Sequence, residues 1–416
     1  MAASADTSSN MKRTVRDPRL DFFRGVAMFI IFIAHTPRDF WALYIPARFG
    51  FSDATETFVF CSGMASALAF GAIFSKRGWL MGAARIVYRV WQVYWAHIGL
   101  FFAVLLLVTS LDQAGIFVSE NWNRSYVTSL NLKHFFTKTP DLIIGLFTLT
   151  YVPNYFDILP MYLVILAMIP IVMALSKISL HAVLAFVVIC WLAANLHLFG
   201  FDGINFPAEP WSFRPWFFNP LGWQLVFFTG FAFMIGWIKP PKVSRGRVML
   251  AAVLVLITIP FAYYRLLNEF PVLRAAATEL KPLTSKTSFG IFRYIHFLAT
   301  AYLAWVAVGP MGSRLKNWGR GQIIVDTIRK VGQQSLAVFV SSLVIAQMVG
   351  AGFKVFGSHW AIVLVGNLIG FAGLIAVAHS VAWFKSQPWR HSAATQPVQN
   401  GPVTVPNGAL ARKSAH

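Results

Sequence analysis

The stretch RLDFFRGVAMFIIFIAH at residues 19–35 decides what kind of protein this sequence encodes. Between Arg24 and His35 it contains no charged residue, and similar apolar runs recur along the chain. Hydrophobic residues make up 57% of the 416 residues and charged residues only 12%, whereas soluble domains carry about 25% charged residues. This composition leaves too little polar surface for an ordinary soluble globular protein, so we expect a membrane protein.

About ten helices are expected to cross the membrane, because a helix needs about 20 apolar residues to cross about 30 Å of hydrocarbon. The apolar stretch 142–152 is too short to cross and ends at Pro153, so we interpret it as a re-entrant or interfacial segment. The predicted fold is an all-α polytopic integral membrane bundle. Its spans are expected at 22–41, 56–75, 83–109, 156–176, 181–200, 220–239, 247–266, 290–310, 334–353 and 361–384.

The basic residues indicate how this bundle is oriented. If the N-terminus is cytoplasmic, most of the 35 Lys and Arg residues lie on the inner side, so both termini are expected inside. Topology also explains the formal net charge of +20 better than nucleic-acid binding does, because no zinc-finger spacing or basic helix accompanies it. We expect a polar cytoplasmic tail over 1–21, a membrane domain over 22–385 and a disordered cytoplasmic tail over 386–416.

Arg24 and His35 are the residues of the first predicted helix that suggest chemistry. Eleven steps of about 100° return a helix to within about 20° of its starting direction, so the two side chains share one face, about 16 Å apart along the axis. An imidazole in hydrocarbon is costly, so we expect His35 to face a cavity and to be functional. The alternative is that His35 bonds a neighbouring helix and Arg24 only follows the inner-side charge bias.

Acidic residues begin the second and fourth predicted spans. Asp53 and Glu56 have the spacing of a capping box, with Asp53 as the N-cap. Either carboxylate is also a candidate catalytic group, because a carboxylate on Nδ1 of His35 would fix the tautomer and stabilise the imidazolium. Asp157 has a similar ambiguity, since an acid at a helix N-terminus is favoured by the helix dipole and is also a candidate to bind a polar substrate.

The spacing of LDFFRG and His35 resembles the opening motif of the integral-membrane acyltransferase-3 superfamily, whose members use this His in acyl transfer. More specifically, FGFSDATETFVFCSGM, YFDILPMYLVI, NPLGWQLVFFTGF and VGQQSLAVF resemble the OpgC family, and the similarity runs from about 17 to 385. The resemblance implies O-succinyl modification of osmoregulated periplasmic glucans in the bacterial inner membrane. It further implies an acyl-CoA donor inside, with succinyl-CoA the expected donor, a glucan hydroxyl acceptor outside, and His35 as the general base.

The third predicted span contains a second motif, AARIVYRVWQVYW, with Arg85 and Arg89 at i and i+4 on one face. It is similar to the Arg-x3-Arg element that acyltransferase-3 proteins use for the acyl donor. Guanidinium groups suit phosphates because each offers a rigid fork of donors and stays charged. We therefore expect Arg85 and Arg89, together with Arg24, to bind the donor, although an inner-side charge bias is the alternative for this pair too.

Five further residues have weaker assignments. His97 is the rival base, at a depth comparable with that of His35 but without the superfamily spacing. Arg293 is a candidate receptor for the free carboxylate of a succinyl group, or else an interfacial anchor. Gln224 and Asn219 match the family strings and are candidates to line a substrate cavity, or else to bond between helices. Ser335 is expected to cap the ninth helix.

Other functions have less support in the sequence. Cys61 and Cys190 lie in apolar runs and the His residues are scattered, so neither a disulfide framework nor a metal centre is expected. No Walker A loop, HExxH motif or Gly-x-Ser-x-Gly elbow occurs in the sequence. The main alternative to acyl transfer is a transporter or flippase for a sugar or lipid-linked precursor, because buried His, Arg and acidic residues also serve proton relays. A non-catalytic scaffold would leave His35 without a role.

Overall fold

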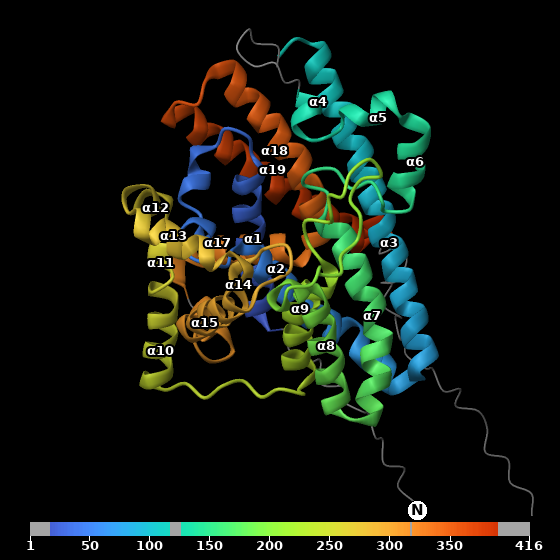
Figure 1. The fold of residues 1–416 in the computed structure, drawn as a ribbon, viewed down its shortest axis with the longest axis vertical. Coiled ribbons are helices and arrows are strands. Elements are labelled where there is room, and N and C mark those ends of the chain that lie inside the picture. The colour runs from blue at the N-terminus through green and yellow to red at the C-terminus, as the bar shows by residue number, and fades with distance from the viewer. Residues whose placement is uncertain (1–16, 117–125, 317, 390–416) are drawn as a thin grey trace, which may run out of the picture.

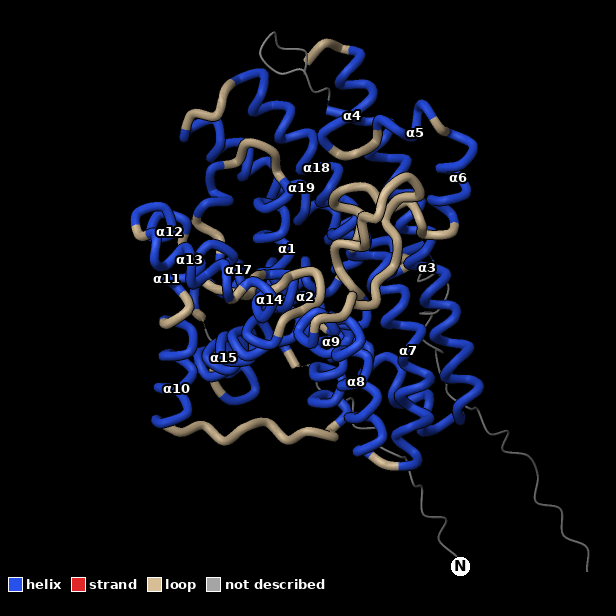
Figure 2. Tube along the Cα trace, in the orientation of Figure 1, coloured by secondary structure: helices blue, strands red, loops and turns tan. Residues whose placement is uncertain are grey.

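The chain is helical throughout the part described by the computed structural model, which covers residues 17–116, 126–316 and 318–389 (Figures 1 and 2). In these ranges the β-structure is limited to an isolated bridge between Pro207 and Pro215. The all-α prediction is therefore confirmed for the described residues. The predicted disordered tail lies outside them from residue 390 onward, as does the predicted N-terminal tail up to residue 16.

Eleven longer helices form the body of the described bundle, and shorter helices fill its connections. The longer ones are α1 (Pro18–His35), α2 (Ala54–Ser66), α3 (Ala72–Gln113), α7 (Ile158–Ile178), α8 (Leu180–Ala194), α9 (Pro220–Ile235), α10 (Arg245–Leu256), α15 (Ile291–Ala307), α17 (Gln322–Gln333), α18 (Ser335–Phe356) and α19 (Trp360–Ser386). The shorter ones are α4 (Tyr126–Ser129), α5 (Lys133–Thr137), α6 (Thr139–Phe147), α11 (Ile259–Ala262), α12 (Tyr264–Glu269), α13 (Pro271–Glu279), α14 (Lys281–Thr284) and α16 (Ser313–Lys316).

Five helical stretches of the described chain are long and apolar enough to cross a membrane, or six if the bent pair formed by α15 and Pro310–Lys316 counts as one span. Each predicted span overlaps one of the longer helices. However, α8 and α9 have only 15 and 16 residues, so ten crossings and the inner position of both termini stay predictions. The five stretches are Ala54–Gln113, Ile158–Ile178, Arg245–Ala262, Ser335–Phe356 and Trp360–Ser386.

The stretch from Ala54 to Gln113 contains two predicted spans in one run of helix. A π-helical turn at Ala67–Gly71 joins α2 to α3, and Gly78 then interrupts α3 with φ +83° and ψ 172°. Glycine adopts a positive φ without the steric penalty of a side chain. The run therefore changes direction at Gly78, inside the connection that hydropathy predicts between spans 56–75 and 83–109.

The segment 142–152, expected to be re-entrant or interfacial, does not form a long helix. α6 ends at Phe147, and the chain then continues as a loop in which Tyr151 and Val152 are fully buried. The backbone N–H of Val152 donates to the carbonyl oxygen of Ala208, which ties this loop to the one between α8 and α9. Figure 2 shows these tan loops lying together beside the N-terminal end of α9.

Close glycine contacts fix the two helices that carry the predicted catalytic residues. α1 packs against α17, and α2 packs against α9. A Cβ added to Gly25 of α1 would lie 2.0 Å from the Ile328 carbonyl oxygen, and one added to Gly63 of α2 would lie 1.9 Å from the Phe227 carbonyl oxygen. Helix backbones approach so closely only where a side chain is missing. These crossings set the positions of α1 and α2 in the bundle.

Candidate active site

α1 carries Arg24 and His35 at opposite ends. The side chain of Asp17 caps the helix by accepting from the backbone N–H of Arg19, and the helix ends at His35, six residues before the predicted end of the span. Arg24 donates a hydrogen bond to the hydroxyl of Ser335. Ser335 makes no capping hydrogen bond to α18, so its predicted capping role is wrong; its hydroxyl instead joins the start of α18 to α1.

His35 lines a cavity of about 470 Å³ bounded by α1, the start of α2, the start of α7 and the loops beside them. Asp53 and Asp157 line the same cavity, so three residues singled out in the sequence are brought together. Tyr155, Arg214 and Lys286 also line the cavity, and they add a phenol ring and two positive charges. The cavity therefore combines an imidazole, two carboxylates and two cations.

The imidazole of His35 is held by packing. Its ring makes an edge contact with Tyr155, with 5.3 Å between the ring centroids. Its Nδ1 is buried and has no hydrogen-bond partner in the described part of the chain. The predicted hydrogen bond from Nδ1–H of His35 to a carboxylate of Asp53 or Glu56 is therefore not made, and both acids have other partners.

Asp53 and Glu56 form the predicted capping box. The Asp53 side chain accepts from the backbone N–H of Thr55 at 2.7 Å, and Glu56 accepts from the backbone N–H of Asp53 at 2.7 Å. Each acid also pairs with a cation: Asp53 with Lys286 and Glu56 with Arg293, both at 2.5 Å. Burial raises the pKa of Asp53, but the charges of Lys286 and Arg293 outweigh it and hold that pKa below its usual value.

The pair of Glu56 and Arg293 lies behind the wall of the cavity. Glu56 is fully buried, and neither of the two residues is among those that line the cavity. Arg293, predicted to meet a substrate carboxylate, instead neutralises Glu56. The cation that reaches the cavity beside Asp53 is Lys286.

Asp157 is the residue directly before α7, and its side chain lines the cavity. Its side chain is almost fully buried and accepts from the backbone N–H of Phe217 at 3.0 Å. It makes no capping hydrogen bond to α7. Asp157 therefore links α7 to the loop before α9 while one side of it borders the cavity.

Gln224 makes hydrogen bonds between and within helices. This was the alternative to lining a substrate cavity. Its amide donates to the carbonyl oxygens of Val187 at 2.7 Å and Leu221 at 3.1 Å, and it is fully buried away from the cavity. Asn219 caps α9 by accepting from the backbone N–H of Leu221, and it also borders a separate cavity described below.

Arg85 and Arg89 lie on the side of α3 that faces away from the cavity around His35. Arg85 is exposed and its guanidinium lies over the ring of Tyr88, 5.2 Å from the centroid. Arg89 donates to the amide oxygen of Gln92 at 3.2 Å. Figure 1 shows α3 along one edge of the bundle, while α1 lies in its interior. Neither arginine lines the cavity around His35.

His97 has a different environment from His35. Its side chain is fully buried, and neither ring nitrogen has a hydrogen-bond partner in the described chain. The ring of Phe156 makes an edge contact with it, with 6.4 Å between centroids. His97 does not line the cavity that holds His35, so the two candidate bases are not equivalent.

A smaller cavity of about 220 Å³ adjoins the first, because Ile30, Asp53 and Ala54 line both. It extends along α1 as far as Phe23 and is closed on the other side by residues of α15, among them His296. The two cavities are therefore neighbours, and the smaller one lies toward the N-terminal half of α1.

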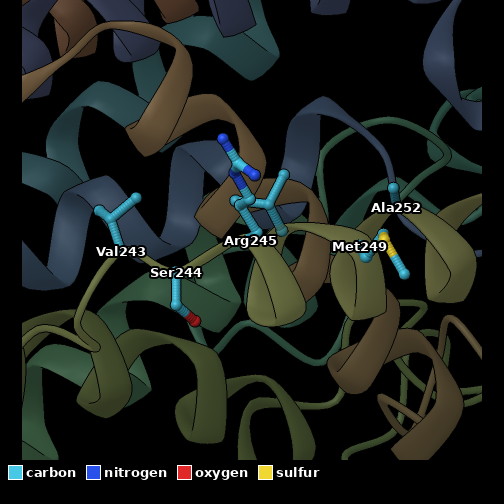
Figure 3. Close-up of a pocket in the computed structure, with 6 residues that line it drawn as sticks. Val243, Ser244, Arg245, Met249 and Ala252 are labelled. Carbon is cyan, nitrogen blue, oxygen red and sulfur yellow. The ribbon is translucent and has the colours of Figure 1, made fainter.

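Two further cavities lie away from His35. One of about 880 Å³ is formed by the loop before α9 and the segment around α14, and it meets the His35 cavity at Arg214, which lines both. Another of about 570 Å³ lies at the start of α10 (Figure 3), where Arg245 is the one charged residue among Val243, Ser244, Met249 and Ala252. This last cavity contains none of the predicted site residues.

Sequence reasoning missed Lys286, Arg214 and Tyr155. All three lie in loops, without helical periodicity to indicate where their side chains point. Arg214 is held by an ion pair with Glu209 at 3.1 Å and by a hydrogen bond to the carbonyl oxygen of Val152 at 2.7 Å. Burial raises the pKa of Glu209, but its bonds with Ser212, Asn131 and Arg214 outweigh that effect and lower it.

Comparison with known proteins connects this site to a family. A family model described as OpgC protein matches residues 16–386, which include every residue of the cavity around His35. Searches of the curated proteins and of the solved structures gave no match. Because the family model covers nearly the whole sequence, this chain belongs to the OpgC protein family.

Proposed function

We propose that this protein is an O-acyltransferase of the bacterial inner membrane that moves an acyl group, succinyl in the first instance, from cytoplasmic acyl-CoA to a hydroxyl of a periplasmic glucan. Membership of the OpgC family suggests a membrane glucan-modifying acyltransferase. The observation that carries the proposal is the buried, unpartnered Nδ1 of His35 in a cavity shared with Asp53, Asp157, Arg214 and Lys286.

In the proposed reaction His35 acts as the general base. A glucan hydroxyl oxygen attacks the thioester carbonyl carbon while an imidazole nitrogen takes the hydroxyl proton. The carbon–sulfur bond then breaks, and the leaving thiolate takes that proton, so the products are an ester and free coenzyme A. An imidazole suits this exchange because its ordinary pKa lies near neutral pH.

The charged wall supports separate roles for the cations and acids. Lys286 is the proposed receptor for the free carboxylate of a succinyl group, because Lys286 lines the cavity and Arg293 does not, although each of the two cations is paired with an acid. Asp157 is proposed to accept hydrogen bonds from acceptor hydroxyls, because a carboxylate is a strong acceptor. Asp53 and Glu56 are proposed to position α2 and Lys286 rather than to touch His35 directly.

The donor is proposed to approach along α1. The cavity of about 220 Å³ between Phe23 and Asp53 supports this route, because it adjoins the cavity of His35. Arg24 is the proposed donor-side cation on that helix. Arg85 and Arg89 are proposed to attract the anionic donor from the surface, since the exposed Arg85 and the half-buried Arg89 lie outside the cavity and their charges act at a distance.

The proposal is tested with purified protein, succinyl-CoA and a neutral glucan, with ester formation followed by mass spectrometry. His35→Ala should lower the rate by about 10² to 10⁴-fold, the usual contribution of general-base catalysis, while the protein stays folded in detergent. Undiminished product would remove His35 as the base. A transporter, the remaining alternative, would move glucan across a vesicle membrane without any acyl donor.

A further inference from the structure

The cavity of about 880 Å³ beside Arg214 has no role in the proposed chemistry. The loop before α9 supplies Asp202, Asn205, Ser212 and Phe213 to its wall, and the segment around α14 supplies Lys281 and Ser285. The wall therefore offers hydrogen-bond donors and acceptors together with aromatic surface. This combination suits an uncharged polyhydroxylated ligand, whose hydroxyls need both kinds of partner and whose sugar rings carry apolar C–H faces.

The aromatic part of this wall is open to the ligand. Phe213 is fully exposed, with a relative exposure of 106%, and Phe206 is 37% exposed. An exposed ring in a membrane protein is often an interfacial anchor. Here both rings border a cavity that is also lined by polar residues such as Asp202, Asn205 and Ser285, so they lie where a sugar ring would stack.

Arg214 places this cavity next to the reacting centre. It lines both the 880 Å³ cavity and the cavity of His35. The ion pair of Arg214 with Glu209, the bond of Glu209 to the amide of Asn131 at 2.9 Å and the bond of Arg214 to Val152 hold the boundary in place. The two cavities thus lie on either side of Arg214, which is the spatial order required by a chain molecule with one unit at His35 and the next units beyond Arg214.

We infer that this second cavity binds the sugar units next to the acylated one, so that the protein recognises an oligomeric acceptor rather than a single sugar. The inference rests on the proposed function and adds an extended acceptor site to it. Phe213 is the residue on which a flanking sugar ring stacks, and the polar residues of the two loops hydrogen-bond its hydroxyls. Shortening the acceptor then removes binding energy without changing the chemistry at His35.

The test compares methyl glucoside, which has no flanking unit, with linked glucose oligomers as acceptors for succinyl-CoA. For the wild-type protein we expect kcat/KM to rise with acceptor length. Phe213→Ala should lower kcat/KM for the long acceptor about two- to tenfold, the range for one aromatic contact, and leave kcat/KM for methyl glucoside unchanged. The loss should appear in KM, because the flanking units do not react.

Phe201→Ala is the matched control, since Phe201 is also exposed, at 67%, and lies in the same loop but does not line the cavity. It should behave as the wild type does with every acceptor. Equal kcat/KM for all lengths in the wild type, or an equal loss for short and long acceptors in Phe213→Ala, would overturn the inference. Failure of the wild type to acylate any acceptor would instead count against the proposed function, and direct binding of the unmodified oligomers to wild type and Phe213→Ala would still decide on the extended site.

Discussion

His35 and His97 are both candidate bases from the sequence, but the bundle surrounds them differently. His35 borders a cavity with two carboxylates and two cations, while His97 is fully buried and shares no part of that cavity. The difference shows that a similar predicted depth along a membrane helix does not give two histidines the same surroundings. What distinguishes His35 is the group of charged residues from distant parts of the chain that meet beside it.

The buried pair of Glu56 and Arg293 should give the largest change in stability when it is broken. Glu56→Ala leaves the largely buried Arg293 guanidinium with only its 3.4 Å hydrogen bond to the Thr284 carbonyl oxygen, and breaking such a pair typically costs about 3–5 kcal/mol. We expect a lower free energy of unfolding in detergent, measured by denaturant titration. This would sharpen the comparison, because the surroundings of His97 offer no such pair in the described residues.

A double replacement controls this experiment. Glu56→Leu combined with Arg293→Met removes both charges, so the protein should recover most of the stability lost in Glu56→Ala. If the single and double variants unfold at the same denaturant concentration, the ion pair does not hold the wall of the His35 cavity.

His97→Leu should change stability in the opposite direction. A neutral imidazole always carries one N–H, and a buried donor without a partner costs about 1–3 kcal/mol. Leucine has no such group, so we expect a higher free energy of unfolding and unchanged acyl transfer. Loss of transfer in His97→Leu would break the comparison by giving His97 a part in the chemistry.

The smallest effect is expected at Asp53. Because its pKa is lowered in the folded protein from the ordinary value of 3.8, its contribution to stability is present above about pH 4 and lost as the pH falls below that value. Asp53→Asn should therefore flatten the acid limb of the stability curve. Lys286 is partly exposed, so the loss at neutral pH should be about 1 kcal/mol. An acid limb identical to that of the wild type would show that the pair with Lys286 contributes nothing.

Local patterns in the sequence predicted the local features of the site. The capping box of Asp53 and Glu56 was predictable because it depends on two residues three positions apart. The helix that carries Arg24 and His35 was predictable from an apolar run between them. The place of Asp157 at the start of a helix was also predictable from the apolar run that follows it. Its hydrogen-bond partner, the backbone N–H of Phe217, was not predictable.

Long-range partners were not predictable from these patterns. Arg293 and Glu56 are separated by 237 positions, and Lys286 and Asp53 by 233. Arg85 and Arg89 illustrate a second limit. Their spacing places them on one face, but a membrane helix is apolar on all sides, so its pattern does not reveal which face meets the protein and which meets lipid.

The glycine contacts of α1 with α17 and of α2 with α9 affect how an acceptor enters. Backbones that already touch leave these helices no room to slide closer, and moving them apart would expose paired carbonyl groups to hydrocarbon. For the glucan acceptor proposed above, we therefore expect entry and release to involve the segments around 201–219 and 281–289, which line the 880 Å³ cavity. We expect turnover to respond to changes in those segments even where no residue of the reacting centre is altered.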